Sequence, residues 1–291
     1  MMNRREVLTF AVCAGVAGPL LPTTSRSAEE ESQQYRIIDT NVSLFRWPFR
    51  RLPLDDTDVL VKKLRSLGIT QAWAGSFEGI LQRDIVGVNQ RLADACANYP
   101  ELIAIGSINL KLPNWEDDLR RCTDGHNMPG IRLHPNYHGY TLDDPEFMRL
   151  LDLATAAGRL IQIAAAVEDT RTQHTLAQVP DVDLVPLVKL LTDIPEANVQ
   201  ILNHSLRPPL LQRLCELPGV YFDTARVDGT DGIPKLAESV PPSRVMFGSH
   251  APFLIPEAAL IRVHESEILD ETMLKAVFSE NAKQAFGVFT V

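Results

Sequence analysis

The stretch "IIDTNVS", residues 37–43, has the composition of a buried β-strand that ends in polar side chains. Isoleucine, threonine and valine favour strands, and the polar residues Asp39, Asn41 and Ser43 follow one another at the period of two that a strand imposes. The following segment, "DDTDVLVKKLRSLG", has the spacing of an amphipathic helix, with aspartates suited to its start and a glycine at its end. A strand followed by such a helix is the repeating unit of an α/β fold.

The same alternation continues along the chain. We expect eight strands, at residues 36–41, 70–75, 103–108, 130–134, 160–165, 199–203, 220–224 and 244–248. Helical patterns such as "DPEFMRLLDLATAAG" and "DVDLVPLVKLLTDIP" lie between most of them. Alternating strands and helices pair the strands in parallel, and eight such units predict a (β/α)8 TIM barrel in one domain, residues 35–291. A doubly wound open sheet is the alternative, but no glycine-rich phosphate loop follows the first strand.

The N-terminus resembles a targeting segment. The pair Arg4 and Arg5, followed after one position by Val7 and Leu8, matches the twin-arginine export signature, and residues 8–21 form an uncharged run too short to span a bilayer comfortably. We expect a signal peptide at residues 1–28 and a polar spacer at 29–34. The mature protein would then be exported, to a bacterial periplasm or cell envelope, without a stable membrane span. A retained anchor or a cytosolic tail is the alternative.

Charge and cysteine content exclude other classes. The formal net charge of −9 lacks the basic footprint of nucleic-acid-binding proteins, so we expect no nucleic-acid partner. Outside the signal, Cys96, Cys122 and Cys215 are odd in number and widely spaced. They predict neither a disulfide framework nor a zinc knuckle.

Histidines gather at the predicted strand ends, where barrel enzymes place their active sites. Three of the seven histidines, His134, His204 and His250, fall at such ends. Imidazole can act as a general base, polarise a carbonyl or bind a divalent metal. We predict these three as catalytic residues, and a hydrogen-bonded core role for each is the alternative.

Arginines and acidic residues near the same ends suggest a small anionic, carboxylate-bearing substrate. In "AVEDTRTQH", residues 166–174, Glu168, Asp169 and Arg171 either form an ion-pair network that orders the loop or let Arg171 clamp a carboxylate. The predicted substrate-binding residues are Asn41, Arg132, Glu168, Arg171 and Asp223.

Five segments together resemble the amidohydrolase-related family, in the branch that includes aminocarboxymuconate-semialdehyde decarboxylase-like enzymes. They are "IIDTNVSLFRWPF", "GIRLHPNYHGY", "ILNHS", "VMFGSHAPF" and "SENAKQAFG", and the resemblance spans roughly residues 35–288. It implies a (β/α)8 barrel that hydrolyses or non-oxidatively decarboxylates its substrate, commonly around one zinc or manganese ion.

The resemblance also implies a metal-ligand set that this chain has largely replaced. Asn41 and Ser43 stand where the family has a His-x-His pair, and the fifth strand ends in alanines. His204 matches the strand-six position, whereas His250 stands where the family has an aspartate. Asparagine and serine are weak neutral donors, so most of the binding energy of a transition-metal site is missing.

Three interpretations follow. In the first, the enzyme is metal-free: His250 or His134 is the base for a water, and His204, Arg132 and Asn41 orient the substrate, as in lactone-hydrolysing relatives. In the second, His134, His204 and His250, with Asp39 or Asp223, hold a zinc or manganese ion. In the third, the barrel is a non-catalytic binder of small molecules.

Overall fold

The computed structural model describes residues 36–227 and 231–286, which belong to one compact unit. The predicted signal peptide and spacer lie outside the described residues and stay predictions. Among the described helices, none combines the length and the apolar character that a membrane span needs.

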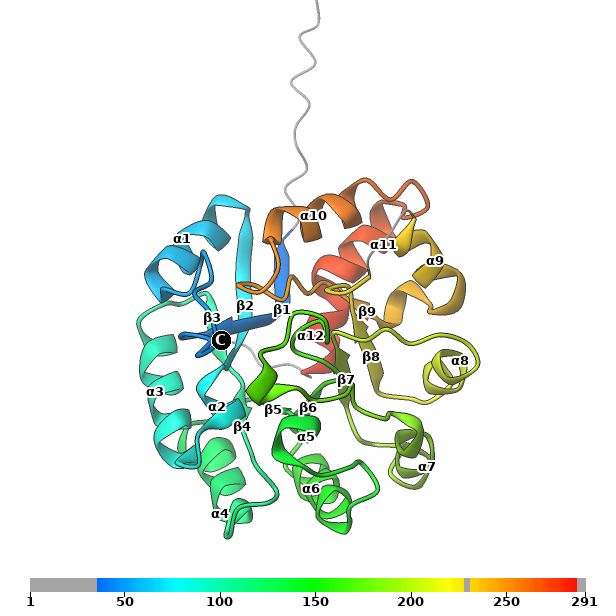
Figure 1. Ribbon diagram of the computed structural model, residues 1–291. Helices are drawn as coiled ribbons and strands as arrows, with labels where there is room; N and C mark the ends of the chain where they lie inside the picture. Colours follow the sequence, from blue (N-terminus) through cyan, green and yellow to red (C-terminus); the bar gives the residue numbers. More distant parts are fainter. Residues whose placement is uncertain (1–35, 228–230, 287–291) are drawn as a thin grey trace, which may run out of the picture. The chain divides into compact units, whose positions relative to one another are not determined.

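Eight parallel barrel strands follow in the predicted order, the third of them in two pieces, with helices arranged around them (Figure 1). The strands are β1 (Ile37–Leu44), β2 (Ile69–Ser76), β3 (Leu102–Ala104), β4 (Gly106–Ser107), β5 (Gly130–Leu133), β6 (Leu160–Ala164), β7 (Val199–Leu202), β8 (Val220–Asp223) and β9 (Val245–Met246). β3 and β4 together form the third barrel strand. Ile105 separates them and donates its backbone N–H to the carbonyl of Ala74 in β2.

Strand pairing gives a three-stranded sheet, β1-β2-β3, and a six-stranded sheet, β4 to β9 in order. Backbone bonds join β1 to the segment that follows β9, from Thr40 N to Phe247 O and from Ser43 N to Ala251 O, each 2.9 Å. Parallel strands in sequence order, bonded across both gaps, confirm the (β/α)8 architecture, although the pairing is not one continuous sheet.

Helices follow most strands and cover the outer face. They are α1 (Thr57–Ser66), α2 (Glu78–Leu81), α3 (Ile85–Ala97), α4 (Trp115–Arg120), α5 (Pro135–His138), α6 (Pro145–Ala156), α7 (Val185–Asp193), α8 (Leu210–Cys215), α9 (Gly232–Ser239), α10 (Pro256–His264), α11 (Glu271–Lys275) and α12 (Asn281–Ala285). Short 3₁₀ or π turns are η1 (Arg121–Gly125), η2 (Thr175–Ala177), η3 (Pro242–Arg244) and η4 (Ala276–Glu280). The side chains of Asp56 and Asp84 cap the first turns of α1 and α3, as the sequence predicts.

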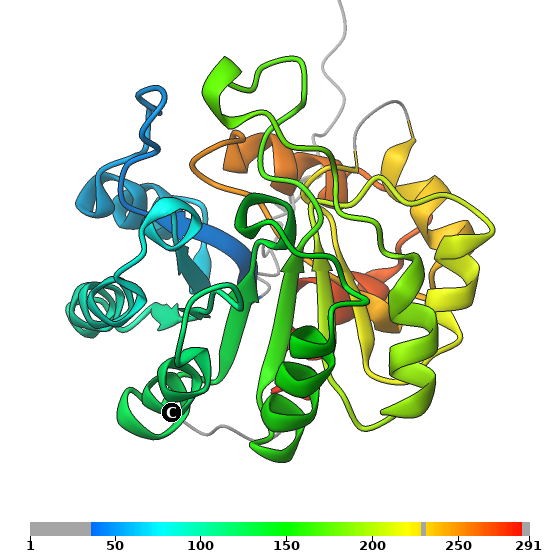
Figure 2. The same cartoon turned by 60° about the horizontal axis from the view of Figure 1, so that its bottom comes forward.

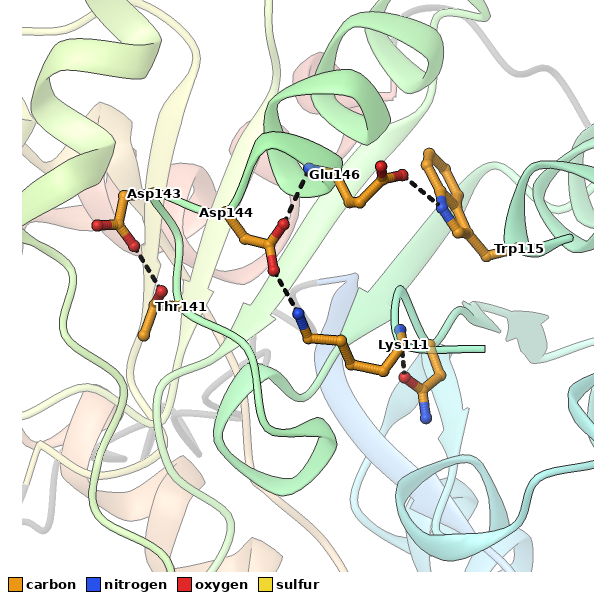
Figure 3. Close-up of polar contacts among 7 residues, drawn as sticks. Lys111, Trp115, Thr141, Asp143, Asp144 and Glu146 are labelled. Carbon is orange, nitrogen blue, oxygen red and sulfur yellow. Dashed lines mark hydrogen bonds and ion pairs between the residues drawn. The ribbon is translucent and has the colours of Figure 1, made fainter. Parts of the chain in front are cut away.

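Polar contacts between neighbouring loops fix the start of α6 (Figure 3). Asp144 caps α6 by accepting from the Glu146 N–H at 3.0 Å and also accepts from Lys111 Nζ at 2.6 Å. Trp115 Nε1 donates to the Glu146 carboxylate at 2.8 Å. The loops after the third and fourth barrel strands are thereby tied together.

The lumen of the barrel contains an unusually polar layer. Gln162 Nε2 donates to Thr40 O and to Gln200 Oε1, both at 2.8 Å, and Gln200 Nε2 donates to Thr40 Oγ1 at 2.7 Å. All three side chains are completely buried. Because a buried polar group without a partner is costly, this closed set of bonds fixes the register of β1, β6 and β7 beneath the strand ends.

Candidate active site

A small enclosed cavity lies at the carboxyl ends of the strands. Its polar lining consists of Asn41, Ser43, Arg132, His134, Asn203 and His250. The free volume inside this cavity is about 10 Å³, which is roughly enough for one water molecule. The fold therefore brings two of the three predicted histidines together with Asn41 and Arg132.

Asn41 connects three strand ends through its amide. A register shift in β1 between Asp39 and Val42 turns Asn41 toward the barrel axis. Its Nδ2 donates to Asn203 Oδ1 at 2.8 Å and to Asp223 Oδ2 at 2.7 Å. Asn203 N in turn donates to Asp223 Oδ1 at 3.0 Å. Both N–H groups of the Asn41 amide are used, so its orientation is determined by the protein itself.

Two fully buried carboxyl groups lie at this end of the barrel. Asp39 Oδ1 accepts from Asn41 N at 3.1 Å and from Ser249 N at 2.9 Å, while its Oδ2 has no partner in the described part of the chain. Burial raises the pKa of Asp39 to about 6. Burial, with a smaller effect of the Asp39 charge, raises the pKa of Asp223 to about 7. Both groups therefore change protonation near neutral pH.

Arg132 is buried and bound mainly to the protein. Its Nη1 donates to Val42 O at 2.8 Å and to Ser43 Oγ at 3.2 Å, its Nη2 to Trp73 O at 3.2 Å, and its Nε to Gln162 Oε1 at 2.8 Å. A β-carbon at residue 75 would come within 2.7 Å of Nη1, so a glycine is needed there. Burial lowers the pKa of Arg132 to about 10, so it stays positive at neutral pH. With four of its five N–H groups used, it can offer a substrate mainly its charge.

His250 and His134 are neutral at the cavity. His250 Nε2 lies 2.8 Å from the carbonyl oxygen of Val167; because a carbonyl only accepts, Nε2 carries the proton and Nδ1 the lone pair. That Nδ1 has no partner among the described residues, nor does His134 Nδ1. Burial lowers the pKa of His250 to about 4 and that of His134 well below its ordinary value. His250 also has a φ of 57°, a strained conformation for histidine that is typical of functional sites.

His204 lies away from this cavity. Asn203, at the end of β7, adopts a left-handed φ of 55° and directs its own side chain to Asn41. His204 then lines a separate cleft beside α8 and α9, together with Arg226. The structure therefore does not bring the three predicted histidines to one point.

The two remaining predicted residues form separate ion pairs. Glu168 pairs with Arg50 at 2.6 Å and is almost fully buried. Arg171 pairs with Asp169 at 2.7 Å, and its side chain is 86% exposed. This segment, between β6 and α7, rises above the strand ends (Figure 2). The predicted network of Glu168, Asp169 and Arg171 is divided: Asp169 and Arg171 pair with each other, whereas Glu168 pairs with Arg50 in the first loop. Arg171 is not among the residues that line the cavity.

Aromatic side chains close the cavity from the loop side. Trp47 packs edge-on against Phe49, Phe77, Tyr137 and Phe253, with ring centroids 5.3–6.2 Å apart. Phe77 also lines the cavity, and Phe253 stacks on the His250 ring at 5.2 Å. These five residues are called the aromatic cover below. Their packing leaves room for a water but not for a substrate.

The donor set does not fit the metal site that the resemblance implies. Asn41 uses its amide N–H groups within the protein, Ser43 accepts from Arg132, and His204 lies in another cleft. Across residues 36–227 and 231–286, no three His, Cys, Asp or Glu side chains are placed to hold a metal ion. The three-histidine site of the second interpretation is therefore not formed, and the zinc or manganese ion stays an unconfirmed possibility.

Comparison with known proteins establishes the family. The sequence model described as amidohydrolase matches residues 45–288. The chain belongs to the amidohydrolase family. The match begins directly after β1, so the strand that contains Asn41 and Ser43 lies outside it. No curated relative matches this amidohydrolase in sequence.

Solved structures share the fold of this amidohydrolase at low identity. A 2,6-dihydroxybenzoate decarboxylase from Rhizobium has a TM-score of 0.67 at 14% identity, covering 85% of this chain and 98% of its own. A dihydroxybenzoic acid decarboxylase from Polaromonas, solved with bound manganese, has a TM-score of 0.68 at 13% identity, covering 87% and 97%. An amidohydrolase 2 from Bifidobacterium longum subsp. infantis has a TM-score of 0.60 at 18% identity, covering 87% and 98%. Family membership supports the expectation of a hydrolase or lyase.

Two site features escape prediction from the sequence. Asn203 seems ordinary beside His204 in "ILNHS", yet its amide reaches the cavity. Arg50 and Trp47 of "FRWPFRRLP" are visible as a basic and aromatic segment, but their roles depend on Glu168 and Phe253, which lie far away in sequence.

Proposed function

We propose that this amidohydrolase is a metal-independent hydrolase of a small carboxylate-bearing lactone or related ester. The observation that carries the proposal is the hydrogen-bonded group of Asn41, Asn203 and Asp223 beside a one-water cavity. Asn41, the centre of this group, stands at a position where the family resemblance places a metal ligand. A water in this cavity would be the nucleophile.

His250 is the proposed base. Its Nδ1 lone pair would accept a proton from the water as the water oxygen bonds to the ester carbonyl carbon. The imidazolium would then return that proton to the departing alkoxide, giving a hydroxycarboxylate. Because burial lowers the pKa of His250 to about 4, it is a weak base. Weak base catalysis suits an ester, whose alkoxide leaves more easily than the amine of an amide.

The remaining groups orient the reactants. Arg132 supplies a buried positive charge, and the Asn41 amide and the neutral His134 ring fix polar partners around the water. Asp223, with its pKa raised to about 7, accepts from Asn41 Nδ2 at Oδ2 and from Asn203 N at Oδ1 and so keeps both groups in place. A substrate can enter only after the aromatic cover moves, and such motion often limits turnover.

The test combines metal removal with replacement of the base. The full chain, treated with a chelator and checked by elemental analysis, is assayed on a panel of lactones, amides and aromatic carboxylates. We expect lactone turnover that survives chelation, and a loss of about 10²–10⁴-fold in His250→Phe. His126→Phe, before the first residue of β5 at the opposite barrel end, is the matched control. Stoichiometric zinc or manganese whose removal abolishes activity would overturn the proposal.

A non-catalytic binder is the second candidate, because the Asn41 amide and most of the Arg132 guanidinium are bonded within the protein and not directed at a reacting group. It is supported if no compound of the panel is turned over while one of them raises the melting temperature. Decarboxylation, named for two of the structural relatives, would instead release carbon dioxide from the aromatic carboxylates.

We also propose that the protein is exported. The twin-arginine pattern at Arg4 and Arg5 supports this, and it lies outside the described residues. Replacing both arginines by lysine should retain the protein in the cytoplasm of a bacterial host, as fractionation would show. An unchanged distribution would contradict export by this route.

A further inference from the structure

A second cleft lies beside the barrel axis, next to the ends of β7 and β8. Its volume is about 440 Å³, and its wall includes α8 and α9 residues. Asn203 lines the small cavity at the strand ends, which is called the axial cavity below. The next residue, His204, lines this second cleft. The end of one strand thus separates the two spaces, and the cleft is large enough for a small organic molecule.

Buried polar atoms without partners lie in the wall of this cleft. His204 is only 4% exposed; one ring nitrogen faces the backbone carbonyl of Asp223, and the other has no hydrogen-bond partner within residues 36–227 and 231–286. Nη1 of Arg226 is likewise buried and without a partner there. Leaving such groups unsatisfied costs about 1–3 kcal/mol each. The charged Arg226 and the neutral His204 therefore lie in one wall of the cleft, where a single ligand can bond to both.

The charge of the cleft selects an anion. Of the lining residues that the structure describes, Arg207, Arg226 and Lys235 are basic and Glu238 is acidic, and Lys235 already has an interaction within the chain. Asp169 lies within electrostatic reach of Arg226, but its carboxylate already accepts two bonds from the Arg171 guanidinium. A guanidinium binds a carboxylate through paired N–H groups.

His204 adds a second requirement. Burial lowers the pKa of His204 to about 4, so the ring is neutral and has one N–H donor and one lone pair. The N–H group faces the backbone carbonyl of Asp223, whereas the lone pair needs a hydrogen-bond donor. A hydroxyl on the ligand supplies that donor. Leu206, Leu211 and Leu236 give the cleft an apolar side suited to a hydrocarbon body.

We propose that this cleft is a binding site for a small hydroxycarboxylate, whose carboxylate pairs with Arg226 and Arg207 and whose hydroxyl donates to His204. The site is separate from the axial cavity, and it does not depend on the proposed hydrolysis. An apolar part of the ligand packs against the leucines.

The test uses the matched pair mandelate and phenylacetate, which share a ring and a carboxylate and differ by one hydroxyl. Each is titrated calorimetrically into the full chain, with inorganic phosphate as a third probe. We expect mandelate to bind several-fold more tightly than phenylacetate, because one neutral hydrogen bond contributes roughly 2- to 10-fold. Failure of both carboxylates to bind at about 10 mM, or phosphate binding as tight as that of mandelate, would overturn the proposal.

Variants assign the binding to named groups. Arg226→Gln should weaken both carboxylates by about tenfold or more, and Arg226→Lys, which keeps the charge, by less. His204→Phe should abolish the preference for mandelate. Arg149→Gln, an exposed arginine on α6 that pairs with Glu116 outside the cleft, should change neither affinity. Unchanged affinity in Arg226→Gln, or a preference that survives His204→Phe, would refute the assignment.

His250→Phe separates the cleft from the axis. If the ligand binds in the cleft, this variant should bind mandelate as the unmodified chain does, even where it has lost hydrolytic activity. A loss of binding in His250→Phe would place the ligand on the barrel axis instead, against the proposal. Failure of the proposed hydrolysis alone leaves these affinities unchanged.

Discussion

Replacing Asp223 by asparagine should remove part of the pH dependence of folding. The carboxyl group is completely buried at the end of β8, and its pKa rises from 3.8 to about 7. The folded state therefore keeps a proton that the unfolded chain has already released. For such a raised pKa, stability is lost as the pH rises from about 4 to about 7. At about 1.4 kcal/mol per pKa unit, the total penalty is on the order of 4 kcal/mol.

Asparagine 223 cannot ionise, so this penalty disappears in Asp223→Asn. The new side chain has one acceptor oxygen in place of two, and either Asn41 Nδ2 or Asn203 N loses its partner. That loss costs about 1–3 kcal/mol and does not vary with pH. The variant should therefore be less stable than the unmodified protein at pH 5, and should gain roughly 3 kcal/mol relative to it by pH 8.

Urea denaturation followed by circular dichroism at several pH values measures this difference. Buried histidines titrate in both proteins and cancel from the comparison. Asp152→Asn, an exposed aspartate on α6, is the control and should show no such trend. A stability difference between Asp223→Asn and the unmodified protein that is the same at pH 5 and pH 8 would refute a raised pKa at Asp223.

Three other changes test separate parts of the barrel. Arg132→Met removes four hydrogen bonds to β1, β2 and β6. It should lower the free energy of unfolding, measured in urea, by about 3–5 kcal/mol. A loss below about 1 kcal/mol would contradict the structural role of Arg132. Trp47→Ala removes the central side chain of the aromatic cover and should lower the free energy of unfolding by about 3–5 kcal/mol, which a lower melting temperature would show. An unchanged melting temperature would show that the aromatic cover does not pack as described. Between pH 7 and pH 5 the His204 ring should contribute a loss of stability, because the unfolded His204 protonates near pH 6.5 while the folded one, with a pKa of about 4, does not; protonation of Asp223 over the same range acts in the opposite direction. His204→Phe should lessen that loss by roughly 2 kcal/mol, and an equal loss in both proteins would argue against a neutral His204.

Local signals in the sequence are enough to predict the fold. Most barrel strands are short β-branched runs followed by an amphipathic helix, several of these helices are capped by an aspartate, and parallel pairing follows from that alternation. The bounds of two strands could not be predicted in the same way. The expected strand at 103–108 is interrupted at Ile105, and the expected strand at 244–248 is reduced to β9, with Arg244 in a 3₁₀ turn. Both differences depend on which backbone N–H and C=O groups the neighbouring strands present for pairing.

The site was predictable in composition but only partly in geometry. His134 and His250 line the axial cavity as strand-end histidines should. His204 does not, because the left-handed conformation of Asn203 turns the chain after β7. A backbone angle of this kind depends on the bond from Asn41 to Asn203, between residues far apart in sequence. Strand spacing alone could not reveal it.

The replacements on β1 give the polar groups at this barrel end partners within the protein. Clustered imidazole and carboxylate ligands repel or stay unsatisfied unless a cation joins them. Here the neutral Asn41 amide donates to Asn203 and Asp223, and Ser43 accepts from Arg132. The Arg132 guanidinium provides a fixed positive charge near Asp39 and Asp223. This fixed charge offsets part of the negative charge of the two buried carboxyl groups. Within the described residues, Nδ1 of His250 and Nδ1 of His134 are among the buried polar atoms that have no partner, and both histidines line the cavity where a water or a ligand would bind.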